Sequence, residues 1–215
     1  MAKSLNPSGK KHRFNKAWMR EHVTDTYVKE AQRLGYRSRS AFKLIELAEK
    51  DKLFRRGMTV VDLGAAPGSW CQVLRERLGP QAKILAVDML PMAPLPGVTI
   101  VQADFSGDEG LAAVKAALNA ARVDLVLSDM APNLSGIESA DQARSVHLAE
   151  LALEFASDAL QPGGDFVVKV FQGAGQAEFQ RAVAQRFTKT YVRKPKASRD
   201  RSSEIFIVAK GRRNS

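Results

Sequence analysis

Short apolar runs rich in Val, Ile and Leu alternate along the chain with longer segments whose apolar residues recur every three or four positions. The short runs are typical of buried strands, and the longer segments are typical of amphipathic helices. Strands are predicted at residues 59–63, 83–88, 98–104, 123–130, 165–171, 188–194 and 204–210. Helices are predicted at residues 69–78, 108–120, 139–160 and 176–187, and the turn Pro162-Gly163-Gly164 is expected to end the third.

This order of elements predicts an α/β fold. Most of the predicted strands are continuous apolar runs, which is typical of a parallel sheet covered by helices on both faces. The last two strands are joined by a basic loop without a helix, so we expect that pair to be antiparallel. The expected architecture is a doubly wound, mostly parallel seven-stranded sheet with one antiparallel strand. Ligands of such sheets bind beyond the carboxyl ends of the strands, and this directs attention to the residues there.

Charge is distributed unevenly along the 215 residues. The net charge is +9 over residues 1–56, −6 over residues 57–188 and +7 over residues 189–215. Two basic ends that meet in space would form a surface suited to the phosphate backbone of a nucleic acid. The alternative, solvated basic tails, is expected for residues 1–16 alone, because the other basic segments contain regularly spaced apolar residues.

Other features of the composition narrow the class of protein. The chain has no apolar run long enough for a membrane span and no secretory signal at its basic start, so we expect no membrane partner. The single cysteine, Cys71, cannot form an intramolecular disulfide, which suits the cytoplasm. Because His12, His22 and His147 lack ligand spacing, we expect no metal site.

A glycine-containing turn, DLGAAPGSW at residues 62–70, follows the first predicted strand and leads into a helix. Glycine permits a positive φ and a close approach of a ligand to the backbone. A dinucleotide site would show a middle glycine, where this chain has Ala66 followed by Pro67. The turn therefore favours a ligand without pyrophosphate over a nicotinamide cofactor. The expected contacts are Gly64, Ala65, Pro67, Gly68 and Trp70.

Three successive predicted strands end near an aspartate: Asp88, Asp104 and Asp129. Each one alone is more often a residue that starts a loop or caps a helix. Together, at the carboxyl edge and beside the glycine turn, they indicate recognition of an adenosine, with Asp88 placed to accept hydrogen bonds from ribose hydroxyls.

Five stretches that span nearly the whole chain form a set that occurs in one family. They are RSRSAFKL (37–44), TVVDLGAAPGSW (59–70), SDMAPNLSG (128–136), PGGDFVVKVFQG (162–173) and RKPKASRDRSSEIFIVA (193–209). With these motifs the chain resembles the FtsJ/RrmJ heat-shock RNA methyltransferases. The family often has a glycine where this chain has Ser69, which can still cap the helix.

The resemblance implies a Rossmann-like methyltransferase fold and S-adenosylmethionine as the methyl donor. It implies transfer of the methyl group to the ribose 2′-hydroxyl of a uridine in large-subunit ribosomal RNA. It also implies a Lys-Asp-Lys-Glu tetrad, which falls on Lys43, Asp129, Lys169 and Glu204. The family's cofactor contacts fall on Gly68, Trp70, Asp88, Asp104 and Asp129.

The positions of the residues in the predicted strands independently support part of the implied tetrad. Lys169 lies within the apolar strand FVVKVF, where an unpaired ammonium would be costly, so it needs a carboxylate partner or a function. It is predicted near the carboxyl end of its strand, beside Asp129, and Glu204 begins a reversed strand at the same edge. We expect Lys169 to deprotonate or polarise the hydroxyl, while which lysine acts as the base stays open. For Lys43 and Glu204, the residues alone favour solvated surface charges.

Basic residues mixed with aromatic ones lie on either side of the tetrad positions in the sequence. Such mixtures suit RNA, because phosphates bind the cations and bases stack on the rings. The expected RNA contacts are Arg37, Arg39, Arg193, Lys194, Lys196, Arg199 and Arg201. We expect residues 17–215 to form a single domain, whose helical N-terminal extension (17–56) contributes to RNA binding, and we expect a monomer.

Two alternatives stay open at the level of sequence. One is a methyltransferase that acts on transfer RNA, an mRNA cap, another RNA or a small hydroxylated molecule. The other is a non-catalytic ribosome assembly factor that binds ribosomal RNA and retains the methyltransferase fold. The substrate particle, free or assembled, is not fixed by any residue.

Overall fold

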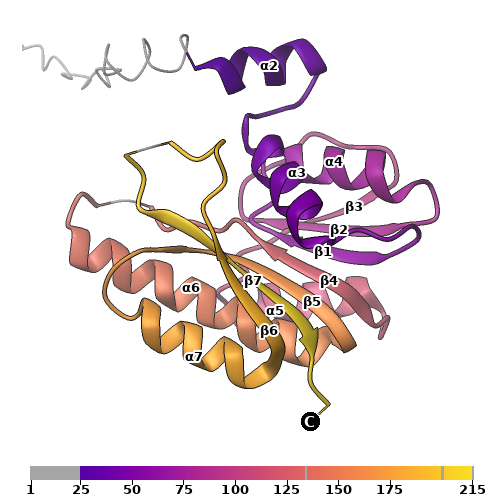
Figure 1. The fold of residues 1–215 in the computed structure, drawn as a ribbon. Coiled ribbons are helices and arrows are strands. Elements are labelled where there is room, and N and C mark those ends of the chain that lie inside the picture. Colours follow the sequence, from indigo (N-terminus) through magenta and orange to yellow (C-terminus); the bar gives the residue numbers. More distant parts are fainter. Residues whose placement is uncertain (1–24, 134, 200, 215) are drawn as a thin grey trace, which may run out of the picture.

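A computed structural model describes residues 25–133, 135–199 and 201–214 (Figure 1). The predicted basic tail, residues 1–16, lies outside this part. The helices are α2 (Thr26–Leu34), α3 (Ser40–Asp51), α4 (Ser69–Leu78), α5 (Asp108–Leu118), α6 (Glu138–Ala159) and α7 (Gln176–Arg186). The strands are β1 (Thr59–Leu63), β2 (Lys83–Asp88), β3 (Val98–Gln102), β4 (Val123–Ser128), β5 (Leu160–Phe171), β6 (Phe187–Arg193) and β7 (Glu204–Arg212).

The seven strands form one sheet in the order β3-β2-β1-β4-β5-β7-β6. Neighbours from β3 to β5 are parallel, and β7 runs antiparallel to both β5 and β6. The predicted fold class is confirmed. Helices α3 and α4 cover one face and α5, α6 and α7 cover the other, so the apolar core forms two layers (Figure 1). Among the described residues, no helix has the length and apolar character to cross a membrane.

Several predicted boundaries were wrong, for local reasons. The third predicted strand stops at Gln102 because the side chain of Asp104 accepts hydrogen bonds from the backbone and hydroxyl of Ser106, which turns the chain. The fourth stops at Ser128, so Asp129 begins the following loop. The fifth strand starts early, at Leu160, and includes the Pro-Gly-Gly sequence that we expected to be a turn. Leu160 pairs with Val123, and an irregularity in the β4–β5 register accommodates the extra residues.

The start of α4 also differs from expectation. Ser69 was the predicted N-cap, but the N-cap is Gly68, with a φ of 103°, and no side chain caps this end. The Ser69 hydroxyl instead lies 2.8 Å from the hydroxyl of Ser38. Ser69 therefore links the N-terminal extension to the glycine turn.

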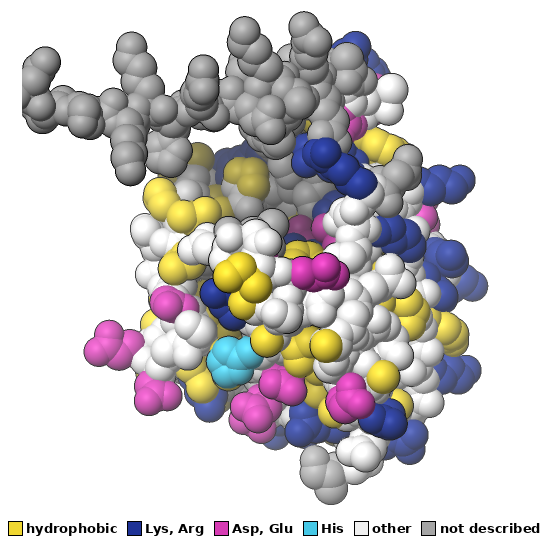
Figure 2. Space-filling view, turned by 90° about the vertical axis from the view of Figure 1, so that its left-hand side faces the viewer, with side chains coloured by type: hydrophobic (Ala, Val, Ile, Leu, Met, Phe, Trp, Pro, Cys, Tyr) yellow, Lys and Arg dark blue, Asp and Glu magenta, His cyan; other side chains and the backbone are white. Residues whose placement is uncertain are grey.

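The two basic segments of the chain lie side by side. Arg193 at the end of β6 forms an ion pair with Asp51 at the end of α3, with 2.5 Å between nitrogen and oxygen. The ammonium of Lys210 on β7 donates to the carbonyl of Lys52. Figure 2 shows Lys and Arg side chains along the right-hand side of the molecule, whereas Asp and Glu side chains gather at the left and bottom. The predicted meeting of the two basic segments therefore occurs, and it produces one positive side.

One carboxylate lies within the core. Asp62 of β1 is fully buried on the face covered by α3 and α4. One of its oxygens accepts the thiol hydrogen of Cys71 at 3.2 Å, and the other has no hydrogen-bond partner among the described residues. Burial raises the pKa of Asp62 to about 7, and the nearby carboxylates of Asp129 and Asp88 add to the effect. The folded protein therefore favours the neutral acid.

Replacing Asp62 with Asn tests this account. The raised pKa means that the folded state holds its proton more tightly than the unfolded chain, so wild-type stability falls as pH rises from about 4 to about 7. Between pH 5 and pH 8 the Asp62 contribution to the unfolding free energy should decrease by about 3 kcal/mol. Urea unfolding at both pH values should show this decrease in the wild type and in the exposed control Asp158→Asn, but not in Asp62→Asn. An identical decrease in all three proteins would contradict the assignment.

Candidate active site

The glycine turn after β1 is held tightly against the neighbouring strand ends. Gly64 has a φ of 78°, and a Cβ there would lie 2.8 Å from the backbone nitrogen of Met130. Glycine is therefore required at this position for both conformational and steric reasons. An Asp88 carboxylate oxygen accepts a hydrogen bond from the backbone of Ala66 at 2.9 Å, and its other oxygen accepts one from Leu90. Asp88 thereby joins the glycine turn to the loop that follows β2.

Arg37 makes a second connection between these two loops. Its guanidinium donates to the carbonyl of Pro67 in the glycine turn at 3.0 Å, and to Ala93 and Pro94 in the loop after β2 at 2.8 and 2.9 Å. A Cβ on Gly68 would lie only 2.7 Å from this guanidinium. Arg37 was predicted to contact RNA, but the structure shows its donors directed at backbone carbonyls. Its position makes it a clamp that couples the N-terminal extension to both loops.

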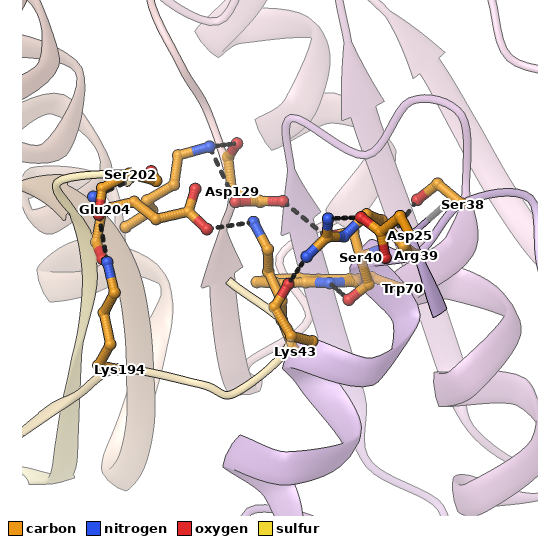
Figure 3. A network of polar contacts seen from close by, with 12 residues as sticks. Asp25, Ser38, Arg39, Ser40, Lys43, Trp70, Asp129, Lys194, Ser202 and Glu204 are labelled. Carbon is orange, nitrogen blue, oxygen red and sulfur yellow. Dashed lines mark hydrogen bonds and ion pairs between the residues drawn. The ribbon is translucent and has the colours of Figure 1, made fainter. Parts of the chain in front are cut away.

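Four charged residues from separate parts of the chain meet beside the carboxyl end of β4 (Figure 3). We call Lys43, Asp129, Lys169 and Glu204 the tetrad. The Lys169 ammonium lies 2.8 Å from a carboxylate oxygen of Asp129 and donates to the Asp129 carbonyl at 2.6 Å. The Lys43 ammonium lies 2.6 Å from a carboxylate oxygen of Glu204. The four side chains are 8 to 18% exposed, so the ion pairs are largely shielded from water.

Each tetrad residue is placed by the fold for a simple reason. Asp129 follows β4, and Lys169 lies two residues before the end of β5, the neighbouring parallel strand. Glu204 begins β7 opposite Phe171, the last residue of β5, because the two strands are antiparallel. Lys43 arrives from the first turn of α3, which packs over this edge. The structure therefore brings all four predicted positions together.

Ser40 and two aromatic rings complete the surroundings of the tetrad. The Ser40 hydroxyl donates to Asp129 at 2.9 Å, and the Ser40 carbonyl accepts the indole hydrogen of Trp70 at 2.8 Å. Trp70 is buried against Phe206, whose ring lies 5.8 Å below the Lys43 ammonium. Its indole nitrogen and its burial make Trp70 part of the core that supports the tetrad, and its predicted contact with the cofactor stays a prediction.

The charges in the tetrad favour the ionised carboxylates. Burial raises the pKa of Asp129, but the ammonium groups of Lys169 and Lys43 outweigh it, so the net direction is below the ordinary value. Burial also raises the pKa of Glu204, but Lys43, the Ser198 hydroxyl and Lys169 together lower it below the ordinary value. Both carboxylates therefore stay charged near neutral pH and hold the two ammonium groups in place.

A groove of about 410 Å³ opens beside the tetrad between α3 and the loop that joins β6 to β7. Lys43 and Glu204 line it together with Arg39, Arg199 and Arg201. Arg39, one of the predicted RNA contacts, has two internal partners: it pairs with Asp25 and donates to the carbonyl of Ala197. The groove thus joins the tetrad to a positively charged rim.

The other predicted cations lie around the same loop. The Lys194 ammonium donates to the carbonyls of Ser202 and Glu204, the latter at 2.9 Å. Lys196 is exposed and lines a neighbouring depression with Arg199 and Arg201. Arg193, through its ion pair with Asp51, fixes β6 to α3. Their contacts with RNA stay predictions.

The profile of the FtsJ-like methyltransferase family matches residues 36–212. The chain belongs to the FtsJ-like methyltransferase family. A protein of Azoarcus sp. (strain BH72) named ribosomal RNA large subunit methyltransferase E is 57% identical over 93% of this chain and 97% of its own length. A protein of the same name from Thiobacillus denitrificans is 56% identical over 94% of this chain and 91% of its own.

A solved structure is also similar. The crystal structure of a ribosomal RNA methyltransferase from Plasmodium falciparum matches with a TM-score of 0.75 and 30% identity. The match covers 84% of this chain and all of that one. The family assignment therefore agrees with the fold.

FtsJ-like methyltransferases in general depend on S-adenosylmethionine, and the loops of this chain fit such a molecule. The Asp88 carboxylate keeps lone pairs free for ribose hydroxyls, since each oxygen accepts one backbone bond. One oxygen of Asp129 pairs with Lys169 and the other accepts a hydrogen bond from Ser40, so the negative charge of this carboxylate suits a neighbouring cationic ligand. Asp104 is exposed, and its carboxylate accepts a hydrogen bond from the Ser106 hydroxyl, so it would lie at the outer edge of a cofactor site between these loops. Backbone contacts of Gly64, Ala65, Pro67 and Gly68 with the cofactor stay predictions.

Two residues with notable positions in the structure, Ser40 and Asp62, were not predicted, although the sequence contained a signal for each. Ser40 lies three positions before Lys43, so both share one face of a helix, and this spacing could have linked Ser40 to the tetrad. Asp62 is a charge within an apolar strand, the same signal that identified Lys169. The position of Arg37 had no such signal, because its partners are carbonyl groups of distant loops.

Removal of the Arg37 guanidinium should loosen both loops that it bridges. In Arg37→Ala, backbone amides of residues 64–68 and 89–97 should exchange with solvent about tenfold faster, because three hydrogen bonds are lost together. Hydrogen exchange followed by mass spectrometry measures this. The control Arg33→Ala removes an exposed ion pair with Glu30 on α2 and should leave both loops unchanged. Equal exchange in the Arg37 variant and the wild type would rule out the clamp.

Proposed function

We propose that this protein transfers a methyl group from S-adenosylmethionine to the ribose 2′-hydroxyl of a uridine in large-subunit (23S) ribosomal RNA. The observation that carries the proposal is the tetrad, two shielded Lys-carboxylate pairs beside the loops that fit the cofactor. The printed names of the two bacterial relatives specify large-subunit ribosomal RNA, which supports this substrate.

The bound cofactor would supply an electrophilic methyl group on a sulfonium. The protein must then fix the hydroxyl in line with that methyl group, and alignment of this kind contributes about 7–11 kcal/mol in well-oriented intramolecular reactions. Lys169 and Lys43 provide hydrogen-bond donors for the hydroxyl oxygen. The fixed positive charge of Lys43 stabilises the negative charge that develops on oxygen as its proton leaves.

In the proposed mechanism Lys169 first gives a proton to solvent, and its neutral amine then takes up the hydroxyl proton as the oxygen attacks. Asp129, 2.8 Å away, stabilises the ammonium that results. Glu204 holds Lys43 at 2.6 Å, and Ser40 fixes the other oxygen of Asp129. The apolar floor formed by Phe206 excludes water from beneath Lys43 and strengthens these interactions.

The groove beside the tetrad is the proposed path of the RNA. Arg199 and Arg201, which line the groove opposite α3, would bind phosphates close to Lys43. We assign the reaction to the cytoplasm, on ribosomal RNA within the assembled or assembling large subunit. One chain contains the whole tetrad, so a monomer suffices.

Replacement of Lys169 with Met should lower methyl transfer at least about 100-fold, because a general base and a donor to the hydroxyl are both lost. Affinity for S-adenosylmethionine should stay near the wild-type value. The measurement is transfer of radiolabelled methyl groups to large-subunit ribosomal RNA from cells that lack the protein, with mapping of the modified nucleotide. The surface variant Lys115→Met should be fully active.

The thermal unfolding of the variant should be measured together with that assay, because Lys169→Met removes the ammonium that neutralises the Asp129 carboxylate. A folded variant with undiminished turnover would refute the role of Lys169. A wild-type protein that binds ribosomal RNA but transfers no methyl group would identify a non-catalytic binding factor. Methylation of transfer RNA alone would reassign the substrate.

Binding of RNA should weaken steeply with added salt. Each phosphate neutralised on a single strand contributes about −0.7 to the slope of log affinity against log salt concentration. Titrations of ribosomal RNA at several salt concentrations should therefore give a clearly negative slope. A flat response would count against the groove.

A further inference from the structure

A second cationic surface lies at the opposite end of the sheet from the tetrad. It is an open depression of about 560 Å³ between the end of α3, the start of β6 and the end of β7. Its cations are Lys50, Lys52, Arg55, Lys189, Arg193 and Lys210. Only two carboxylates line it, Asp51 and Asp165.

Both carboxylates in this depression are already neutralised. Asp51 pairs with Arg193 at 2.5 Å, and Asp165 pairs with Lys210 at 2.5 Å. Lys50, Lys52 and Lys189 are exposed and have no acidic partner in the part of the chain that the structure describes. The depression therefore carries a net positive charge that no internal ion pair offsets.

The cations continue along β6 toward the tetrad. Lys189, Tyr191 and Arg193 alternate along this strand and therefore project from the same face. From Lys189 to Arg193 the strand covers roughly 13 Å. Lys194 and Lys196 then lead to the groove. In Figure 2 the Lys and Arg side chains extend down the right-hand side of the molecule rather than clustering at one end.

The edge strand β6 and its surroundings carry more cations than an edge strand needs to prevent aggregation. A single charged residue can protect such an edge. Here Lys189 lies directly opposite Lys210 in the β6–β7 pair, and like charges in that position destabilise a sheet. Tyr191 is 37% exposed, and the Arg193 guanidinium lies 4.6 Å from the centre of its ring. Exposed aromatic rings beside Arg and Lys are typical of surfaces that bind single-stranded RNA.

We propose that this surface, from Lys50, Lys52 and Lys189 along Tyr191 to Arg193, binds a segment of the ribosomal RNA outside the methylated nucleotide. We call it the β6 track. The inference rests on the proposed function, because it assumes that the tetrad groove holds the target nucleotide. RNA bound in the groove then continues along the edge of the sheet, with its phosphates on the lysines. The β6 track thus favours a long, structured substrate over a short oligonucleotide.

A charge-neutral double variant tests the β6 track. Lys50→Gln with Lys189→Gln should raise KM for intact large-subunit ribosomal RNA about tenfold at low salt, and the slope of log affinity against log salt concentration should become less negative by about 1.4. The turnover number should not change, since neither residue contacts the tetrad. For a short fragment that carries the methylated nucleotide, KM should equal the wild-type value. The matched control, Lys83→Gln with Lys115→Gln, neutralises two exposed lysines on the far strands and helix and should behave as wild type on both RNAs.

Each outcome of this comparison is decisive. An unchanged KM on intact RNA, or an equal rise on both RNAs, would overturn the β6 track. A rise only on assembled subunits, with naked ribosomal RNA unaffected, would also overturn it and point to a protein partner. Failure of the wild type to methylate either RNA would instead refute the proposed function.

Discussion

A lysine ammonium can be placed in an apolar strand only if a carboxylate meets it there. Lys169 is 8% exposed within β5, and the ion pair with Asp129 at 2.8 Å satisfies this constraint. Asp129 in turn follows β4, so the pair depends on β4 and β5 being parallel neighbours. Breaking a buried pair by removing one partner is strongly destabilising, typically by about 3–5 kcal/mol. The fold and the proposed chemistry therefore depend on the same contact.

The rest of the site is organised around that pair. β7 is antiparallel to β5, which places Glu204 where β5 ends, and α3 brings Lys43 and Ser40 to the same point. The N-terminal extension thereby contributes directly to the tetrad. Through Arg37 it also bridges the two loops that fit the cofactor. The same extension lines the RNA groove, so one segment is shared by the proposed cofactor, catalytic and RNA sites.

Sequence predicted the features that follow from periodicity and topology. The strands at 59–63 and 83–88 and the helix at 69–78 agree residue for residue with the structure. Glycines bound the first strand and the helix, and the second strand is a compact apolar run. The proximity of Asp129 and Lys169 followed from placing their strands side by side. The early start of β5, the Ser69 position and the Arg37 clamp did not follow. These depend on contacts with groups that are distant in the sequence, which no local pattern encodes.

The central claim is that Lys43, Asp129, Lys169 and Glu204 act as one unit on the substrate hydroxyl. A double-mutant cycle on Lys43 and Glu204 tests it most directly, with single-turnover methyl transfer as the readout. Residues that act as a unit show strongly non-additive losses. The account predicts that Lys43→Met combined with Glu204→Gln loses no more activity than the worse single variant. Losses that multiply in the double variant would contradict it.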